Sequence, residues 1–322
     1  MDQSVTSETR DWVSEEQLLR VAWYYYVDQL TQDDIAKRMH ISRASAGRLL
    51  ERCRKAGIVT FTINSDHYPA FQLGRQLKDK YGLREALVPP TLEVDSTEQN
   101  RINERLGRGA AQYLQSHLKA GETLGMGWGD TVQQTMRAVS SDSTAKVSTV
   151  SLTGGVGAYL STLRRVRNVA TDTAADHILP TPIVASSEEL AQALHEEAEV
   201  QRVLALARQA DHAIVGIGGL SGAPTIAQLG YTTPEELDLG RASGAVGDLL
   251  GVYYNEAGEV VDLPIHKRRI GITLDELRAI PNVIGVAAGE NKIAAIRGAL
   301  NGGYLDVLVT TEDIARTLLE ED

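Results

Sequence analysis

The sequence predicts an α/β protein with a small helical N-terminal domain and a large doubly wound α/β domain. The chain has 322 residues, which is more than one compact core usually holds. The first 63 residues have helical periodicity, whereas apolar runs alternate with helical stretches beyond residue 71. We therefore expect a winged-helix-like helix-turn-helix domain over residues 1–63 and an α/β domain over residues 64–322. The polar stretch at about 64–71, which contains Pro69, reads as the linker.

The composition is that of an ordinary globular protein, with 43% hydrophobic and 23% charged residues. The single cysteine, Cys53, excludes an internal disulfide framework and fits a reducing compartment. Neither a signal peptide nor a membrane-spanning apolar run is visible. We expect a cytoplasmic protein with no membrane partner.

Charge is distributed unevenly along the chain. Residues 1–56 hold nine Lys or Arg and nine Asp or Glu, so the remaining residues carry the whole net charge of -11. This asymmetry indicates a small part that tolerates a polyanion and a large part that does not bind one.

The N-terminal part has the pattern of a helix-turn-helix. Apolar residues recur at helical spacing from Glu15 to Tyr26, Thr31 stands as an N-cap before a short helix, and Ser42 stands as an N-cap before a helix that runs to about Ala56. "HIS" at 40–42 forms the turn, where His40 occupies a position that is commonly Gly. The alternating residues of "AGIVTFTI", 56–63, suggest a small β wing.

One face of the third helix is basic, which is how a recognition helix meets DNA. Arg43 and Ser45 are candidates for base contacts, because Arg pairs with two acceptors on guanine and Ser serves several bases. Arg48, Arg52, Arg54 and Lys55 are candidates for phosphate contacts. With the capping residue, the expected DNA-binding set is Ser42, Arg43, Ser45, Arg48 and Arg52. The alternative is a helical hairpin with a solvated basic face.

The inner side of these helices predicts a core and an interface. Ala46, Leu49, Leu50 and Cys53 form the expected inner stripe of the third helix, so Cys53 reads as a small core residue. The four aromatic residues 23–26, "WYYY", cannot all face one core. Some of them are expected to contact a neighbouring subunit of a homodimer or homotetramer.

The large part alternates apolar strands with helices, which predicts a mainly parallel sheet covered on both faces. The expected strands lie at 85–90, 123–129, 147–155, 212–219, 283–289 and 306–311. The expected helices lie at 98–119, 188–207, 292–300 and 312–319.

Ligands bind such sheets at the carboxyl ends of the strands, where the glycines of this chain gather. We expect the backbone at Gly127 and Gly129 to approach a ligand, Asp130 and Thr131 to cap the next helix, and the N–H groups of Thr153, Gly154, Gly155 and Gly157 to meet an anion or sugar hydroxyls. Asp248 and Lys292 fall at matching strand ends, and the lysine suits a phosphate or carboxylate. Any one of these turns alone could be only a tight βα connection. No dinucleotide or Walker motif is present.

Several long motifs resemble the SorC family of bacterial sugar-responsive transcription regulators. They are "EEQLLRVAWYYYVDQLTQDDIA", "SLTGGVGAYL", "AIVGIGGL", "SGAVGDLLGVYYNEAGEVV" and "AAGENKIAAIRGALNGGYLDVLVTTEDIA". The resemblance implies a sugar-controlled regulator of a carbohydrate operon, with a domain related to sugar-phosphate isomerases and deaminases and dimers or tetramers on operator DNA. By motif position, the implied effector site consists of Gly127, Trp128, Asp130, Thr153, Gly154, Gly155, Asp248 and Lys292. Neither a cofactor nor a metal is implied.

Two other functions compete with this interpretation. A sugar-phosphate isomerase or deaminase would use Asp130 or Asp248 as a proton carrier and Lys292 to hold phosphate. No His or Glu stands convincingly beside either Asp, and the helix-turn-helix would have no purpose. Nonspecific nucleoid binding fits poorly with an acidic chain without basic tails.

Overall fold

The structure is a computed structural model that describes residues 15–59, 68–90, 99–140, 147–157, 159, 175–222 and 224–320. It divides into two compact units, Met1–Ser65 and Asp66–Asp322. Helix α4 begins at Tyr68, so the last four residues of the expected linker, 68–71, are helical and that part of the prediction is wrong. In the described residues, no helix is long and apolar enough to cross a membrane.

The first unit contains three helical segments. Residues 15–22 are α-helical and continue into the π-helix η1 (Trp23–Val27), followed by α2 (Gln32–Met39) and α3 (Arg43–Lys55). The Thr31 side chain accepts a hydrogen bond from the Asp34 N–H, and the Ser42 side chain accepts one from the Ser45 N–H. Both predicted N-caps are therefore confirmed.

The turn between α2 and α3 is left-handed at His40, with φ 53° and ψ 42°. Glycine is common at this turn position because the backbone there is left-handed, and His is among the other residues that tolerate a positive φ. Residues 56–59, at the start of the expected β wing, form a turn and a bend, because Gly57 has φ 70°. The remainder of that prediction, residues 60–63, lies outside the described residues.

The core of the first unit is small and includes the predicted inner stripe. Ala46, Leu50 and Cys53 are buried against Leu18, Val21, Ala22 and Ile35, and Leu49 is partly buried beside them. Among the four aromatic residues, Tyr24 and Tyr26 pack on this core, and the Arg38 guanidinium lies 4.6 Å from the centroid of the Tyr24 ring. Trp23 and Tyr25 are exposed. The cluster is thus divided between two faces, as the spacing predicted.

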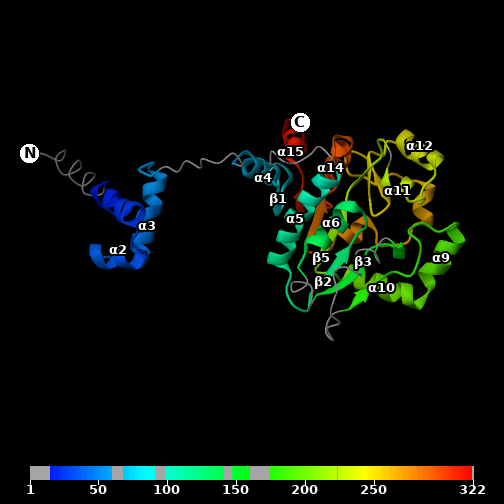
Figure 1. Cartoon of the computed structure of the whole chain (residues 1–322), viewed down its shortest axis with the longest axis horizontal. Coiled ribbons are helices and arrows are strands. Elements are labelled where there is room, and N and C mark those ends of the chain that lie inside the picture. The colour runs from blue at the N-terminus through cyan, green and yellow to red at the C-terminus, as the bar shows by residue number, and fades with distance from the viewer. Residues whose placement is uncertain are drawn as a thin grey trace, which may run out of the picture. The chain divides into compact units, whose positions relative to one another are not determined.

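The second unit is built on a seven-stranded parallel sheet with the order β1-β10-β9-β5-β2-β3-β4 (Figure 1). Its strands are β1 (Glu85–Leu87), β2 (Thr123–Met126), β3 (Ser148–Ser151), β4 (Asp176–His177), β5 (His212–Gly216), β9 (Val283–Val286) and β10 (Val307–Val309). All six predicted strands are present, and each neighbouring pair is parallel.

Helices cover both faces of this sheet, as expected of a doubly wound domain. Strand residues alternate between two cores: Val307 and Val309 belong to one, and Leu308 between them belongs to the other. One face is covered by α5 (Gln99–His117) and α6 (Asp130–Ala138). The other face is covered by α4 (Tyr68–Tyr81), α10 (Ala198–Arg208), α14 (Ile293–Asn301) and α15 (Glu312–Glu320) (Figure 1).

The helix expected over 188–207 is two helices, α9 (Glu188–Glu196) and α10. Glu197 between them has φ -64° and ψ 130°, an extended conformation that ends one helix and caps the next. The charged, apolar-striped sequence shows no Gly or Pro at this point, so nothing local predicted the break.

A second, smaller sheet is inserted between β5 and β9 and was not predicted. It consists of β6 (Gly218–Gly219), β7 (Gly247–Leu249) and β8 (Val252–Tyr254), all antiparallel. The same insertion holds α11 (Thr225–Gln228), α12 (Pro234–Ala242), η2 (Pro264–Arg268) and α13 (Leu274–Arg278), and η3 (Glu290–Lys292) follows β9. This small sheet lies beside the carboxyl ends of the parallel strands, because β6 continues directly from β5.

Candidate functional site

A cavity of about 210 Å³ lies in the second unit at the carboxyl ends of β2, β5 and β9. β2 and β5 are neighbours at the centre of the sheet, and the chain proceeds from them in opposite directions, to β3 and to β9. This is the topological switch point where open α/β sheets bind ligands. The cavity is below the roughly 300–1,000 Å³ of drug-sized sites, so it suits a small molecule.

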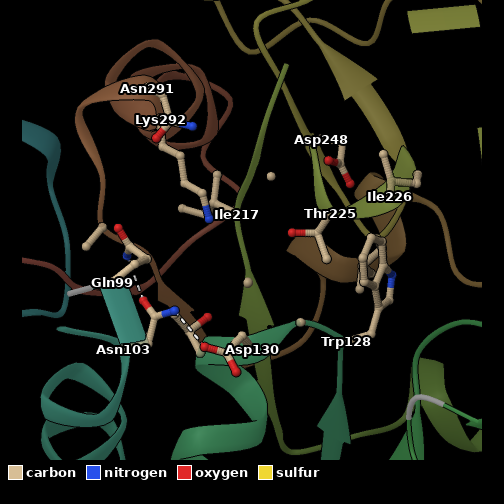
Figure 2. A pocket seen from close by; sticks show the side chains of 16 residues that line it. Gln99, Asn103, Trp128, Asp130, Ile217, Thr225, Ile226, Asp248, Asn291 and Lys292 are labelled. Carbon is tan, nitrogen blue, oxygen red and sulfur yellow. Dashed lines mark hydrogen bonds between the residues drawn. The ribbon is translucent and has the colours of Figure 1, made fainter. Parts of the chain in front are cut away.

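Polar groups of opposite charge line the cavity (Figure 2). Lys292 reaches in from one side and Asp248 stands on the other, with Asp130 at the start of α6 below them. Within the described part of the chain, the Lys292 ammonium makes no hydrogen bond or ion pair. A cation without a fixed partner in a cavity is available to a ligand oxygen.

Asp248 lies in the middle of β7, not at the end of a parallel strand as predicted. Its side chain is 4% exposed, and one carboxylate oxygen accepts a hydrogen bond from the Gly251 N–H at 3.1 Å. Its partner in the sheet is Gly218. A Cβ at Gly218 would lie 1.9 Å from the other carboxylate oxygen, so only glycine leaves room for this carboxylate beside the cavity.

Burial shifts the pKa of both charged groups. It raises the pKa of Asp248 to about 6, although the Gly251 N–H and the Lys292 ammonium favour the carboxylate. Burial lowers the pKa of Lys292, and the carboxylates of Asp248 and Asp130 oppose that shift. Burial therefore disfavours the charged forms of Asp248 and Lys292, and a ligand that hydrogen-bonds to these groups would stabilise their charged forms.

The raised pKa of Asp248 predicts a pH-dependent stability. Between pH 4 and pH 6 the folded protein binds more protons at this site than the unfolded chain, so its contribution to stability is largest at low pH and falls as pH rises through about 6. The shift from 3.8 corresponds to about 3 kcal/mol at neutral pH. We expect Asp248→Asn to gain about that much unfolding free energy relative to wild type between pH 4 and pH 7, measured by urea denaturation.

A variant at an exposed carboxylate controls for the change in net charge. The Asp238 side chain is 74% exposed, so Asp238→Asn should show no comparable gain. A free-energy difference between Asp248→Asn and wild type that stays constant over this pH range would contradict the assignment.

Asp130 is held by a chain of amides that the sequence did not reveal. The Asn103 side-chain N–H donates to the Asp130 carboxylate at 2.6 Å, and Gln99 donates to the Asn103 carbonyl at 2.9 Å. Both amides come from the first turns of α5. Asn291 and Thr225 also line the cavity and were missed. An amide side chain on a helix gives no sequence signal of a binding site, because its role depends on which strand end the helix lies beside in the fold.

The expected helix cap after β2 is different in the structure. Gly129, with φ 122°, is the N-cap of α6 and no side chain caps it, so the prediction that Asp130 and Thr131 cap this helix is wrong. The Thr131 hydroxyl instead donates to the Val286 carbonyl at 2.9 Å, which ties α6 to β9. This bond fixes the start of α6, and hence Asp130, at the cavity.

Half of the expected effector residues line the cavity. Trp128, Asp130, Asp248 and Lys292 do so, and Trp128 also packs edge-on against Tyr231. Gly127 is buried beside them, and its N–H donates to the Ile214 carbonyl rather than facing the cavity.

Contrary to the prediction, Thr153, Gly154 and Gly155 of the loop after β3 do not line the cavity. The Gly154 N–H donates to the Ile270 carbonyl and the Gly155 N–H donates to the Thr181 carbonyl, so neither is presented to a ligand. The Thr153 hydroxyl is buried and bonded to Tyr159. These N–H groups serve the packing of the loop, since a buried N–H must find a partner. Gly157 is exposed and lies outside the cavity lining.

The predicted DNA-contacting side chains lie together on α3 and at its start. Ser42, Arg43, Arg48 and Arg52 are exposed, and Ser45 is half-buried. Arg43 pairs with Asp33 of α2 at 3.6 Å, and Arg48 donates to the Ser45 hydroxyl at 3.0 Å. Ser42 and Ser45 also share a hydrogen bond at 2.9 Å. The two serine hydroxyls are thus occupied by the helix start, whereas both guanidinium groups reach solvent.

The second unit has a polar cavity at the switch point of its sheet, and the first unit has a basic face on α3. These two features define the class of a ligand-binding protein that also has a basic surface on a separate unit. The family model described as "Putative sugar-binding domain" matches residues 66–320, which is most of the chain. The chain belongs to this family. This agrees with the resemblance of its sequence motifs to SorC regulators.

Curated relatives of the chain are transcriptional regulators. The transcriptional regulator LsrR of Enterobacter sp. (strain 638) is 40% identical over 309 residues, 95% of this chain and 93% of its own. LsrR of Escherichia coli O9:H4 is 39% identical over 324 residues, 99% of each. The full-length sorbitol operon regulator SorC from Klebsiella pneumoniae has a TM-score of 0.71 at 29% identity, covering 94% of this chain and 97% of its own.

These likenesses establish the class of the protein. It is a transcriptional regulator of the SorC family with a sugar-binding domain, and not an enzyme. The competing isomerase or deaminase interpretation is therefore set aside. In the part of the chain that the structure describes, no cluster of His, Cys, Asp or Glu could hold a metal ion.

Proposed function

We propose that the chain regulates a carbohydrate-utilisation operon by binding operator DNA through α3 and a sugar, polyol or sugar phosphate through the cavity. The observation that carries this proposal is the Lys292 ammonium, held without a partner among the described residues in a cavity that also contains Asp248 and Asp130. Carboxylates accept hydrogen bonds from hydroxyl groups, and an ammonium binds a phosphate or an oxygen lone pair. This combination fits a polyhydroxylated ligand that is neutral or carries one anionic group.

The first unit is proposed to be a helix-turn-helix. A short helix, a turn at His40 and a longer helix with exposed Arg43 and Arg48 support it. Ser45 is proposed to orient Arg48, to which it is hydrogen-bonded, and Ser42 to hold the start of α3. Arg52 is proposed as a phosphate contact. We also propose that the second unit is related in fold to sugar-phosphate isomerases and deaminases.

Assembly and location follow from the proposed activity. A DNA-binding protein gains specificity when two copies bind two half-sites of one operator, so we propose a homodimer or homotetramer. Such a regulator would act in the cytoplasm, where the operator is. No cofactor is proposed.

A thermal-shift screen tests the proposal directly. A ligand that binds only the folded state raises the unfolding temperature of the full chain, by an amount that grows with the logarithm of its concentration relative to its dissociation constant. We expect at least one member of a panel of sugars, polyols and their phosphates to raise it, and that compound to change retention of operator DNA in a gel shift. A panel without any binder would contradict the proposal.

Gly218→Ala is expected to weaken effector binding about tenfold, because the new Cβ displaces the Asp248 carboxylate from its place beside the cavity. Titration calorimetry with the compound found in the panel measures this loss. The matched control is Gly157→Ala, whose Cβ meets nothing within 4 Å and whose affinity should equal that of wild type. Equal affinities for both variants would show that the Asp248 carboxylate is not a contact.

A further inference from the structure

Asn103 is a polar side chain in an apolar part of the second unit. It is 8% exposed and lies on the face of α5 that packs on α6. Leu106 and Ala110, three and seven residues further along α5, are fully buried in the core on that face. An apolar side chain at position 103 would serve this core, whereas a buried amide costs free energy unless its hydrogen bonds are made. The partners of Asn103 must therefore account for the amide.

The hydrogen bonds of Asn103 run in one direction, from Gln99 to Asp130 (Figure 2). The Asn103 side-chain N–H donates to the Asp130 carboxylate at 2.6 Å, and the Asn103 side-chain carbonyl accepts from Gln99 at 2.9 Å. A carboxylate only accepts hydrogen bonds, so Asp130 fixes which end of the Asn103 amide faces it, and Asn103 in turn fixes the Gln99 amide. The direction of both hydrogen bonds is therefore set by the carboxylate at the cavity.

Close packing of α5 on α6 brings Asn103 to Asp130. Gly107 lies four residues after Asn103, and Gln134 lies four residues after Asp130. A Cβ at Gly107 would lie 2.7 Å from the Gln134 backbone carbonyl carbon, so glycine lets the two helices approach closely one turn away from the hydrogen bond. The distance between Asn103 and Asp130 is therefore set by the helix packing rather than by the two side chains.

The Asp130 carboxylate keeps one oxygen available to a ligand. Its Oδ2 accepts from Asn103, and among the described residues Asp130 has no other hydrogen-bond partner. Asp130 is exposed where it lines the cavity. An exposed carboxylate without a partner changes rotamers freely, whereas a short hydrogen bond to a buried amide holds it in one orientation. Oδ1 is then an acceptor in a fixed place.

We propose that Asn103 is a positioning residue of the effector site, which holds the Asp130 carboxylate so that its second oxygen accepts a hydrogen bond from one hydroxyl of the effector. This inference rests on the proposed function and adds an orientation to it. A fixed carboxylate accepts from a hydroxyl and repels an acidic group, so a hydroxyl-bearing end of the effector lies against Asp130 and any acidic group lies towards Lys292. Ordering the carboxylate before binding corresponds to about tenfold in affinity.

A double-mutant cycle tests whether Asn103 acts through Asp130. The probe is the panel compound, the member of the thermal-shift panel that raises the unfolding temperature of wild type most, and calorimetry measures its affinity for the full chain. Asn103→Leu is expected to weaken binding about tenfold in the wild-type background but less than about twofold in the Asp130→Ala background, where the carboxylate is absent. The cycle is repeated with Asn103→Ala, which adds no bulk. Equal weakening in both backgrounds, or none in either, would overturn the proposal.

Analogues of the panel compound that lack one hydroxyl give a second readout. Wild type is expected to bind one of them about tenfold or more weakly than the compound itself, because the fixed acceptor is then left unpaired. In Asn103→Leu this difference should fall below about threefold. A loss of affinity through misfolding alone would not change the preference for a hydroxyl, so an undiminished preference in Asn103→Leu contradicts the positioning role.

Asn282→Leu is the control for the loss of a buried amide. Asn282 is 2% exposed, is hydrogen-bonded to His212 and Tyr113, and precedes β9 at the end of the sheet opposite the cavity. This variant should bind the panel compound as wild type does, and a loss equal to that of Asn103→Leu would overturn the proposal. A wild type that binds no compound refutes the proposed function. A wild type that binds one, with Asn103 and Asp130 acting independently, refutes only this inference.

Discussion

The double variant Arg43→Ala with Arg48→Ala is expected to bind operator DNA about a thousandfold more weakly than wild type. Both guanidinium groups are exposed on α3, at and near its N-terminus, where a recognition helix meets base edges. A bidentate base contact from Arg43 contributes about 1–3 kcal/mol, and a hydrogen bond from Arg48 to a charged phosphate contributes about 1.5–3 kcal/mol. Together they give about 4 kcal/mol, which is a thousandfold in affinity.

The contacts that these side chains make in the free protein are weak enough to release. The Arg43–Asp33 pair is 3.6 Å long with side chains 70% and 57% exposed, and an exposed pair contributes about 0–1 kcal/mol. Arg48 donates to a neutral serine hydroxyl. Both side chains are therefore free to exchange these partners for DNA at small cost.

A gel shift on genomic fragments retained by wild type measures this effect at one fixed salt concentration, since phosphate contacts make the affinity salt-dependent. The control is Arg202→Ala with Arg316→Ala, two exposed arginines of the second unit that are also paired with glutamates. It removes the same charge and should bind as wild type does. If the Arg43 and Arg48 variant binds within about threefold of wild type, α3 is not the recognition helix.

Lys292→Met is expected to weaken effector binding about a hundredfold. Methionine nearly matches the lysine stem in volume but provides no charge, and a hydrogen bond from a charged donor contributes about 1.5–3 kcal/mol. The free protein should lose no stability, because the half-buried ammonium has no hydrogen-bond or ion-pair partner among the described residues and desolvation lowers its pKa. Weaker binding with equal or greater stability is the signature of a ligand-binding lysine rather than a structural one.

Calorimetric titration of the panel compound measures the affinity, and urea denaturation measures the stability. Lys267→Met is the matched control, since this lysine is 62% exposed and its contact with Glu188 is 3.8 Å. An affinity equal to that of wild type in Lys292→Met would place the effector elsewhere. A large loss of stability would show that the lysine holds the fold.

Strong local signals made most of the fold predictable. The apolar runs gave the parallel strands, and the caps Thr31 and Ser42 gave the starts of α2 and α3. Even the unusual backbone of His40 followed from the spacing of the turn. These features depend on residues close together in sequence. The small sheet around Asp248 does not, because it forms only when the insertion between β5 and β9 folds back on the strand ends. The break at Glu197 has no local signal either, since neither Gly nor Pro stands there.

The lining of the cavity was predictable for charged and aromatic side chains, and not for backbone N–H groups. Trp128, Asp130, Asp248 and Lys292 line the cavity. Thr153, Gly154 and Gly155 do not, because a glycine-rich turn looks the same whether its N–H groups face a ligand or, as here, the carbonyls of Thr181 and Ile270. Gln99 and Asn103 were missed because their role depends on the distance between α5 and α6.

We propose that different units of one chain bind DNA and effector, and that the effector changes the affinity for DNA. Such coupling requires the effector to bind the DNA-competent and DNA-incompetent arrangements unequally. The decisive measurement is the affinity of the full chain for one retained fragment, with and without the panel compound, in wild type, the Arg43 and Arg48 variant, and Lys292→Met.

Lys292→Met is predicted to bind the fragment as wild type does and to ignore the compound, while the arginine variant loses the fragment but keeps the rise in unfolding temperature with the compound. Loss of both activities in either variant, with the fold intact, would contradict the account.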